Sequence, residues 1–179
     1  ANDITSPEIL ANEMPGWDVT DKYKYWNEFV ASFELPYKYY NELIDLTRKL
    51  GMAFISTPAS LDALYFLVQK NIDAIKISSM DLNNSPFLKA VGSTNFPVIL
   101  STGMSTIKEI DKAVEILKKS SLCILHCVSN YPADSEDANI RCIQTIADSC
   151  EVLTGYSDHH LGIDIALAAV ALGAHVIEK

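Results

Sequence analysis

Several features that are common in other protein classes are scarce in this 179-residue sequence. Only 7 Gly and 7 Pro are present, which excludes collagen-like and low-complexity chains, and a 49% hydrophobic content excludes intrinsic disorder. The 14 basic residues are outnumbered by 23 acidic ones, and the net charge of −9 argues against a general binder of nucleic acids or anionic membranes. No apolar run approaches the roughly 18 residues of a membrane span, and the N-terminal sequence does not resemble a signal peptide. We therefore expect a cytoplasmic protein with no membrane contact.

The cysteines are few and their spacing is uninformative for metal or disulfide chemistry. None of the four forms a C-x-x-C pair. Cys123 and Cys127 lie in an apolar, strand-like run, and Cys142 lies on a helical face. Reduced, buried thiols are the simplest interpretation.

From Gly51 onward, short apolar runs alternate with amphipathic segments. The expected strands are 52–57, 73–79, 97–102, 122–129, 152–157 and 175–178. The expected helices are 37–50, 61–70, a segment that begins after the Thr106–Glu109 capping box, 136–149 and 163–172. Strands without polar alternation are typical of a parallel sheet that is covered on both faces.

The strand starts lie about 25 residues apart, which predicts a parallel α/β fold. A doubly wound sheet usually has a Gly-rich first turn, and no G-x-G-x-x-G occurs here. The even spacing favours a (β/α)₈ TIM barrel, which needs about 250 residues. We therefore predict a truncated barrel with roughly strands 3–8, without the first two strands and the last helix. The sequence starts at Ala1 rather than Met and stops at Lys179 within an expected strand, so we expect a piece of a longer protein.

Residues 1–35 differ from the remainder in composition. Nine of the 16 aromatic residues lie within the first 40 positions. We predict a loop or lid excursion that belongs to the barrel and is partly helical at 21–33, with ordinary aromatic packing as the alternative. Residues 36–179 would form the partial catalytic barrel.

Hydroxyl residues end five consecutive expected strands. These ends read Ser56-Thr57, Ser78-Ser79, Ser101-Thr102, Ser129-Asn130 and Ser157-Asp158. In parallel α/β folds the carboxyl ends of the strands share one face, and the following helices direct free N–H groups toward it. Together with Lys76 in an apolar strand, they predict an anion pocket for a phosphate-bearing small molecule. The alternative is that these Ser and Thr residues only cap helices.

Charged residues near these strand ends are further candidates. Lys76 could clamp a phosphate or carboxylate, form a Schiff base, or simply pair with Asp73 or Asp81. Asp81 itself could be an acid/base group or a helix cap. His159 is placed to bind a metal or carry a proton, and Glu178 points toward the same mouth of the barrel.

Two other histidines are given no catalytic role. His126 lies inside an expected strand and is interpreted as a core residue or one that supports the site. His160, adjacent to His159, should face elsewhere.

Six strings in this sequence carry a family resemblance. They are GMAFISTP, IKISSMDLNN, PVILSTGMS, LHCVSNYP, GYSDHHLG and AVALGAHVIEK. In this order they resemble the sialic acid synthase family, the phosphoenolpyruvate-dependent enzymes that make N-acetylneuraminate and related nonulosonates. The resemblance covers about residues 35–179, and the STGMS and GYSDH stretches are specific to it. The family's catalytic domain is a (β/α)₈ barrel, in agreement with the strand spacing.

The resemblance implies an activity and its partners. Phosphoenolpyruvate would condense with the aldehyde form of an N-acetylated aminosugar, with loss of phosphate. N-acetylmannosamine is the default acceptor, and the diacetamido sugars that lead to legionaminate or pseudaminate stay open. A divalent Mn²⁺ or Mg²⁺ would polarise the aldehyde oxygen. The parent protein would be a homodimer with a further antifreeze-like domain.

The resemblance also implies roles for individual residues. The substrate-binding residues would be Thr57, Ser79, Ser101, Ser129, Tyr131 and Ser157. The catalytic residues would be Lys76, Asp81 and Glu178, although the family often has Glu where Asp81 stands. Ser129 takes a place where some members have Asn. His159 would bind the metal, and the second metal histidine would fall at position 180, so we expect the isolated chain to be inactive.

Three other functions remain open at this stage. One is a phosphoenolpyruvate-condensing aldolase that acts on a phosphorylated sugar, which would need a further basic cluster. Another is a Schiff-base aldolase that uses Lys76. The third is a non-catalytic binding or scaffold barrel.

Overall fold

The computed structural model describes residues 29 and 31–179. The chain divides into two compact units. The first contains the described residues up to Phe54 together with Pro58–Ile72, and the second contains Ile55–Thr57 together with Asp73–Lys179. The loop or lid expected at 1–35 lies outside the described residues, apart from residue 29 and residues 31–35.

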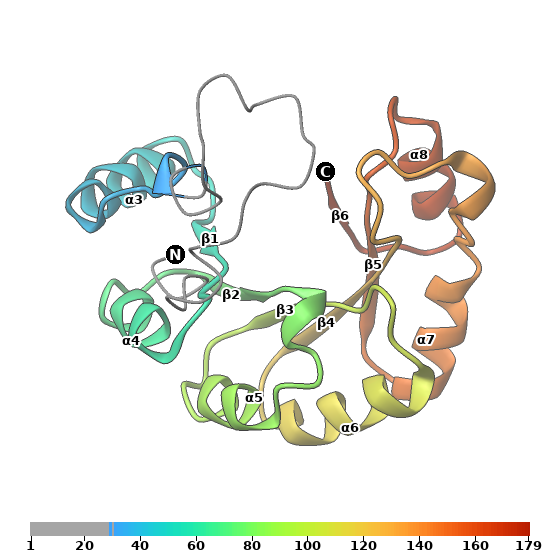
Figure 1. Ribbon diagram of the computed structural model, residues 1–179, viewed down its shortest axis with the longest axis horizontal. Helices are drawn as coiled ribbons and strands as arrows, with labels where there is room; N and C mark the ends of the chain where they lie inside the picture. The colour runs from blue at the N-terminus through green and yellow to red at the C-terminus, as the bar shows by residue number, and fades with distance from the viewer. Residues whose placement is uncertain (1–28, 30) are drawn as a thin grey trace. The chain divides into compact units, whose positions relative to one another are not determined.

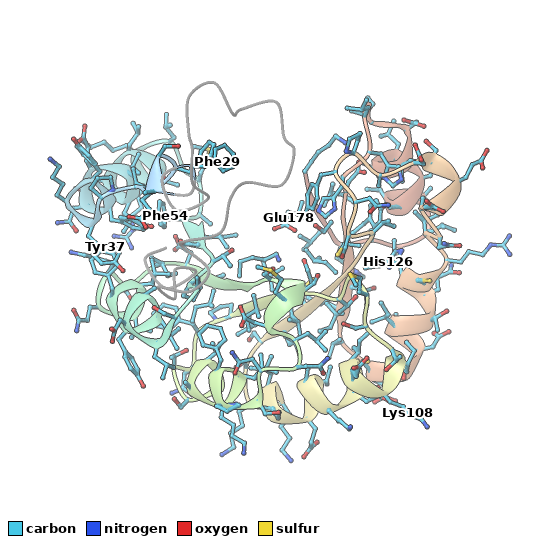
Figure 2. The ribbon with its side chains drawn as sticks, viewed as in Figure 1. Phe29, Tyr37, Phe54, Lys108, His126 and Glu178 are labelled. Carbon is cyan, nitrogen blue, oxygen red and sulfur yellow. The ribbon has the colours of Figure 1, made fainter. Side chains whose placement is uncertain are left out.

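The first unit is helical and is held together by aromatic contacts. Its elements are the 3₁₀ helix η1 (Tyr37–Tyr39), α3 (Tyr40–Lys49) and α4 (Leu61–Gln69). The Tyr37 ring, labelled in Figure 2, stacks on Phe66 with centroids 4.1 Å apart, and Tyr40 meets Phe66 edge-on at 5.2 Å. Ser60 starts α4 as expected, because its Oγ accepts the Ala63 N–H.

The second unit is a curled, six-stranded parallel sheet with helices on its outer side (Figure 1). The strands are β1 (Ile55–Ser56), β2 (Ala74–Ile77), β3 (Val98–Ser101), β4 (Leu122–Cys127), β5 (Leu153–Ser157) and β6 (Val176–Glu178), paired in chain order. The helices are η2 (Ser79–Asp81), α5 (Ser85–Gly92), α6 (Ile107–Leu117), η3 (Ser135–Asp137), α7 (Cys142–Cys150) and α8 (Asp164–Ala171). This is the parallel strand–helix architecture that the spacing predicts. Across residues 29 and 31–179, no helix combines the length and the apolarity needed to cross a membrane.

The core of this unit lies between the outer face of the sheet and the helices. Ile77, Leu100 and Ile124 point to this side and are fully buried. Tyr156 of β5 packs there against Ile143 of α7, in a cluster that includes Ala169 of α8. Because successive strand residues alternate between faces, the neighbouring positions of these strands face inward. The inner face therefore carries Lys76, Ser101 and Ser157 beside apolar residues such as Leu125.

Two helix expectations differ from the structure. The segment 136–149 is not one helix: η3 and α7 are separated by a turn in which Asn139 has a φ of +43°, a conformation that interrupts a helix. Helix α5 was not expected, although Asn84 caps it by accepting the Phe87 N–H and Pro86 stands in its first turn. The capping box of Thr106 and Glu109 at the start of α6 is present as predicted.

All four cysteines are free, in line with the expected reduced thiols. Cys123 and Cys127 are buried, whereas Cys142 and Cys150 are only partly buried. Burial raises the pKa of Cys123 to about 11, so this thiol stays protonated and unreactive at neutral pH.

Candidate active site

The curl of the sheet brings together two charged residues from distant strands. Strands β2 and β6 are four strand spacings apart, about 19 Å in a flat sheet. Nevertheless Lys76 Nζ of β2 lies 3.5 Å from Glu178 Oε1 of β6. Glu178 points to the inner side of the sheet, whereas Lys108 points outward from α6 (Figure 2). The inner face thus surrounds a common region at the carboxyl ends of the strands.

Lys76 is the buried cation of this region. Its ammonium donates to Ser101 Oγ at 2.7 Å and to the Ile77 carbonyl at 3.0 Å, and its side chain is only 10% exposed. Burial lowers the pKa of Lys76, and the Glu178 carboxylate offsets part of that decrease. The acidic partner of Lys76 is therefore Glu178 rather than Asp73 or Asp81.

A second group of inward-facing side chains meets around Gly103, just after β3. The Gly103 N–H donates to Ser79 Oγ at 2.8 Å, and this oxygen lies 3.3 Å from Cys127 Sγ. A Cβ at position 103 would collide with Ser129 Oγ and would come within 2.9 Å of Cys127 Sγ. Only glycine lets the ends of β2, β3 and β4 approach one another this closely.

His159 is held with one ring nitrogen available. Its Nδ1–H donates to the Val128 carbonyl at 2.6 Å, so Nε2 carries the lone pair and lies 3.3 Å from Ser157 Oγ. The Tyr131 ring stacks on His159 with centroids 3.9 Å apart. The tautomer and the ring plane of His159 are thus both set by its neighbours.

Asp158, next to His159, is buried and fully hydrogen-bonded. Lys179 Nζ lies 2.8 Å from its Oδ2, and the His160 N–H donates to its Oδ1 at 2.9 Å. Burial raises the pKa of Asp158, but the hydrogen bonds from Lys179 and His160 outweigh it and leave the pKa below its usual range. His160 faces away from Ser157 as expected, with its Nε2 2.8 Å from the Asp134 carbonyl.

The structure connects most of the predicted residues. Contacts link Lys76 with Ser101 and Glu178, Ser79 with Ser129 through Gly103 and Cys127, and His159 with Ser157 and Tyr131. Thr57 is exposed and directly follows Ser56, the last residue of β1, which pairs with Ile75, so it leaves the sheet next to the strand that carries Lys76. The Asp81 carboxylate instead accepts a hydrogen bond from the Asn84 side chain, in the loop before α5.

One histidine that was given no catalytic role, and two residues that the sequence analysis missed, also have defined places in the structure. His126 lies on the outer side of β4, where its Nε2 is 2.9 Å from the Ala138 carbonyl, in agreement with a core or supporting role (Figure 2). Gly103 and Cys127 were not predicted as parts of the site. Gly103 follows a hydroxyl-rich strand end, and Cys127 stands two residues before Ser129 on the same strand face, so strand alternation could have indicated both.

A metal would find few protein ligands in this part of the chain. Among residues 29 and 31–179, no three His, Cys, Asp or Glu side chains are grouped as a metal cage. His159 Nε2 is suited to be one nitrogen ligand, because its Nδ1–H is already anchored. The described residues thus supply only part of the ligand set of a metal ion.

Comparison with known proteins identifies the family. A model of the NeuB family matches residues 3–179. The chain belongs to the NeuB family. Two curated relatives are similar to it: N,N'-diacetyllegionaminic acid synthase of Campylobacter jejuni is 40% identical, over 85% of this chain and 47% of the relative. N-acetylneuraminate-9-phosphate synthase of Drosophila melanogaster is 34% identical, over 87% of this chain and 43% of the relative.

A solved structure of a sialic acid synthetase has a similar fold. The crystal structure of N-acetylneuraminic acid (sialic acid) synthetase from Leptospira borgpetersenii, in complex with citrate, matches with a TM-score of 0.83 and 39% identity. The match covers 86% of this chain and 54% of that one. The chain spans about half the length of the curated relatives that it matches.

Proposed function

We propose that this chain carries the substrate-binding face of an enzyme that condenses phosphoenolpyruvate with the aldehyde form of an N-acetylated aminosugar. The products are a sialic-acid-type nonulosonate and phosphate. The proposal rests on the buried Lys76, which contacts Ser101 and Glu178 on the inner face of a NeuB-family sheet. The curated relatives, which are named synthases of such sugars, support it.

Lys76 and the hydroxyl groups bind the anionic donor in this proposal. Of the three oxygens around Lys76 Nζ, Glu178 Oε1 is the most distant at 3.5 Å, and it is the contact that an incoming carboxylate or phosphate replaces. Ser101 Oγ accepts from Lys76 and therefore has its own proton free to donate to the same anion. A buried cation with a neighbouring hydroxyl binds an anion strongly because little water competes.

Glu178 and Asp81 are the proposed proton carriers. Glu178 is released from Lys76 when the anion binds, and its carboxylate is 42% exposed in the side chain. As the CH2 carbon of phosphoenolpyruvate bonds to the aldehyde carbon, a water adds to C2 and phosphate leaves; Glu178 accepts a proton from this water, and the former aldehyde oxygen gains one. Asp81 keeps the acid/base role that the family resemblance implies, although its contact with Asn84 restrains it in the free protein.

The aminosugar contacts the exposed side chains near Lys76 and Ser101. Tyr131, Ser129 and Thr57 are exposed at the same strand ends and offer an aromatic face and two hydroxyls. His159 Nε2 would hold a divalent Mn²⁺ or Mg²⁺ together with ligands outside the described residues, and that ion would supply Lewis-acid polarisation of an aldehyde oxygen.

The remaining sequence-based expectations belong to the same proposal. The six strands are assigned as strands 3–8 of an eight-stranded barrel, in a cytoplasmic homodimeric parent protein. Since the chain spans about half of its relatives and offers a partial metal site, residues 1–179 alone should release no phosphate. Phosphate release by the isolated chain with phosphoenolpyruvate, Mn²⁺ and N-acetylmannosamine would overturn that expectation.

Phosphate release by the whole protein that carries this chain tests the function. Mn²⁺, phosphoenolpyruvate and either N-acetylmannosamine or a diacetamido sugar should together release phosphate, and omission of the sugar should stop the release. Turnover only with a phosphorylated sugar would favour the aldolase that uses a second phosphate. Borohydride trapping of a keto substrate on Lys76 would favour the Schiff-base aldolase. Absence of turnover with every acceptor would favour a non-catalytic barrel.

A further inference from the structure

One charged cluster at the carboxyl ends of β5 and β6 has no place in the function proposed above. It consists of Lys179, Asp158 and His160, which we call the Lys179 clamp. The Asp158 side chain has no exposed surface, and a buried carboxylate is tolerated only when its oxygens are hydrogen-bonded. Such a cluster costs free energy to desolvate, and its hydrogen bonds fix the geometry of the groups that form it.

Both oxygens of the Asp158 carboxylate accept hydrogen bonds. Oδ2 accepts from Lys179 Nζ at 2.8 Å, and Oδ1 lies 2.9 Å from both the backbone nitrogen and the Nδ1 of His160. Lys179 donates a second time, to the His160 carbonyl at 2.8 Å. One lysine therefore holds both ends of the three-residue turn that contains His159.

The clamp lies directly behind two residues of the candidate active site. Lys179 follows Glu178, and because strand side chains alternate, Glu178 faces Lys76 while Lys179 faces Asp158. The backbone adds a second tie, since the Asp158 N–H donates to the Glu178 carbonyl at 2.7 Å. The end of β6 is thus fixed to the end of β5 by a main-chain and a side-chain contact.

The same turn is fixed on its other side to the segment after β4. The Ala133 N–H donates to the His159 carbonyl at 3.0 Å, and His160 Nε2 lies 2.8 Å from the Asp134 carbonyl. His159 is therefore held between β6 and the loop that carries Tyr131. Loss of the Lys179 contacts would leave the main-chain bond from Asp158 to Glu178 as the remaining tie between this turn and the end of β6.

We propose that Lys179 is a positioning residue that, through Asp158 and His160, sets His159 and Glu178 relative to each other for the reaction. This inference rests on the proposed function. The clamp does not touch Lys76 or Ser101, so its loss should weaken the chemical step more than the binding of phosphoenolpyruvate.

The experiment compares Lys179→Met, Lys179→Arg and Lys118→Met in the whole protein that carries this chain. Lys179→Met removes both donations and should lower kcat about 10- to 100-fold, the usual effect of losing a group that orients a site residue, with little change in the KM for phosphoenolpyruvate. Lys179→Arg can still donate to Asp158 and to the His160 carbonyl, and should recover most of the activity. Lys118 forms a solvent-exposed pair with Glu115, so Lys118→Met should match the parent.

Nitrogen-15 NMR of histidine provides a readout that does not depend on turnover. The His159 Nδ1 signal, shifted by its bond to the Val128 carbonyl, should move or broaden in Lys179→Met and stay in place in Lys118→Met. An unchanged His159 signal in folded Lys179→Met, or a kcat equal to that of the parent, would overturn the inference. So would a kcat loss that merely equals the unfolded fraction measured by thermal denaturation. If the parent turns over no acceptor, the proposed function fails and the NMR comparison alone decides whether Lys179 positions His159.

Discussion

The candidate active site has a deep group and an outer group that differ in how their side chains are held. The deep group consists of Lys76, Ser101 and Ser157, all less than one-tenth exposed. The outer group consists of Thr57, Ser129 and Tyr131, all exposed, with Tyr131 79% exposed. Deep side chains held by polar contacts, Lys76 with Ser101 and Ser157 with His159, are already organised for a small ligand, whereas exposed ones can adapt to a larger and more variable ligand. This difference accords with the proposed function, in which a small anionic donor meets a larger aminosugar.

Removal of the deep cation should have the largest effect on activity. Lys76→Met should lower kcat/KM for phosphoenolpyruvate by about 10²- to 10³-fold, the usual effect of deleting one preorganised donor to an anion in a shielded site. Steady-state phosphate release measures it, with Lys118→Met as the lysine control. A loss below tenfold would show that the deep group does not bind the anion.

Crowding at Gly103, between the two groups, should have the second-largest effect. Gly103→Ala places a methyl group against Ser129 Oγ and Cys127 Sγ, and overpacking of this kind costs about 1–3 kcal/mol of unfolding free energy. Chemical denaturation should show the lower free energy of unfolding, and phosphate release should show lower activity. Gly92→Ala is the control, because its nearest contact is the Ile116 carbonyl at 3.3 Å; equal effects of the two variants would contradict the close approach at Gly103.

Truncation of the outer aromatic ring should change acceptor binding and leave donor binding intact. A stacked ring contributes about 0.5–1.5 kcal/mol, so Tyr131→Ala should raise the KM for the aminosugar by up to about tenfold. The KM for phosphoenolpyruvate serves as the internal reference. Tyr131→Phe keeps the stack on His159 and should behave like the parent; an equal rise with Phe would assign the effect to the hydroxyl instead.

A substitution of Glu109, which lies outside both groups, should have the smallest effect, a slight change in melting temperature. Hydrogen bonds from the Thr106 backbone and side chain and from Asn83 lower the pKa of Glu109, so the ionised carboxylate stabilises the start of α6. Its contribution is complete above the ordinary pKa of 4.5 and is lost as the pH falls through the lowered pKa. Glu109→Gln should therefore reduce the melting temperature slightly at pH 7, and the difference from the parent should disappear in acid.

The Glu109→Gln variant also tests whether activity depends on the deep and outer groups alone. Phosphate release by Glu109→Gln should equal that of the parent, since Glu109 belongs to neither group. Glu115→Gln is the matched surface control for the melting curves. A pH-independent melting difference would rule out the ionised capping box as its cause.

The sequence was most informative where local signals decide the structure. The short apolar runs predicted the six strands of the described sheet, their spacing predicted its parallel α/β architecture, and the capping residues Ser60 and Thr106 located two helices. The break at Asn139 was missed because a positive φ depends on the turn that forms, and the short α5 was missed because its apolar stretch is brief.

For the site, the sequence of the strand ends predicted the hydroxyl residues but not the side chains that contact them. The pairing of Lys76 with Glu178 depends on how far the sheet curls, which no local pattern encodes. For the same reason Asp81 was an equally good candidate partner in the sequence. The importance of Gly103 depends on side chains from two other strands, so it became clear only in three dimensions.

The contact between Lys76 and Glu178 also has a consequence for biosynthesis. The two residues are about a hundred positions apart, and β3 to β6 must pair in turn before their side chains can meet. During translation, the ammonium emerges from the ribosome long before its carboxylate is made. The ability to retain the anionic donor should therefore arise late in folding, which makes ligand binding a sensitive reporter of whether newly made chains have completed their assembly.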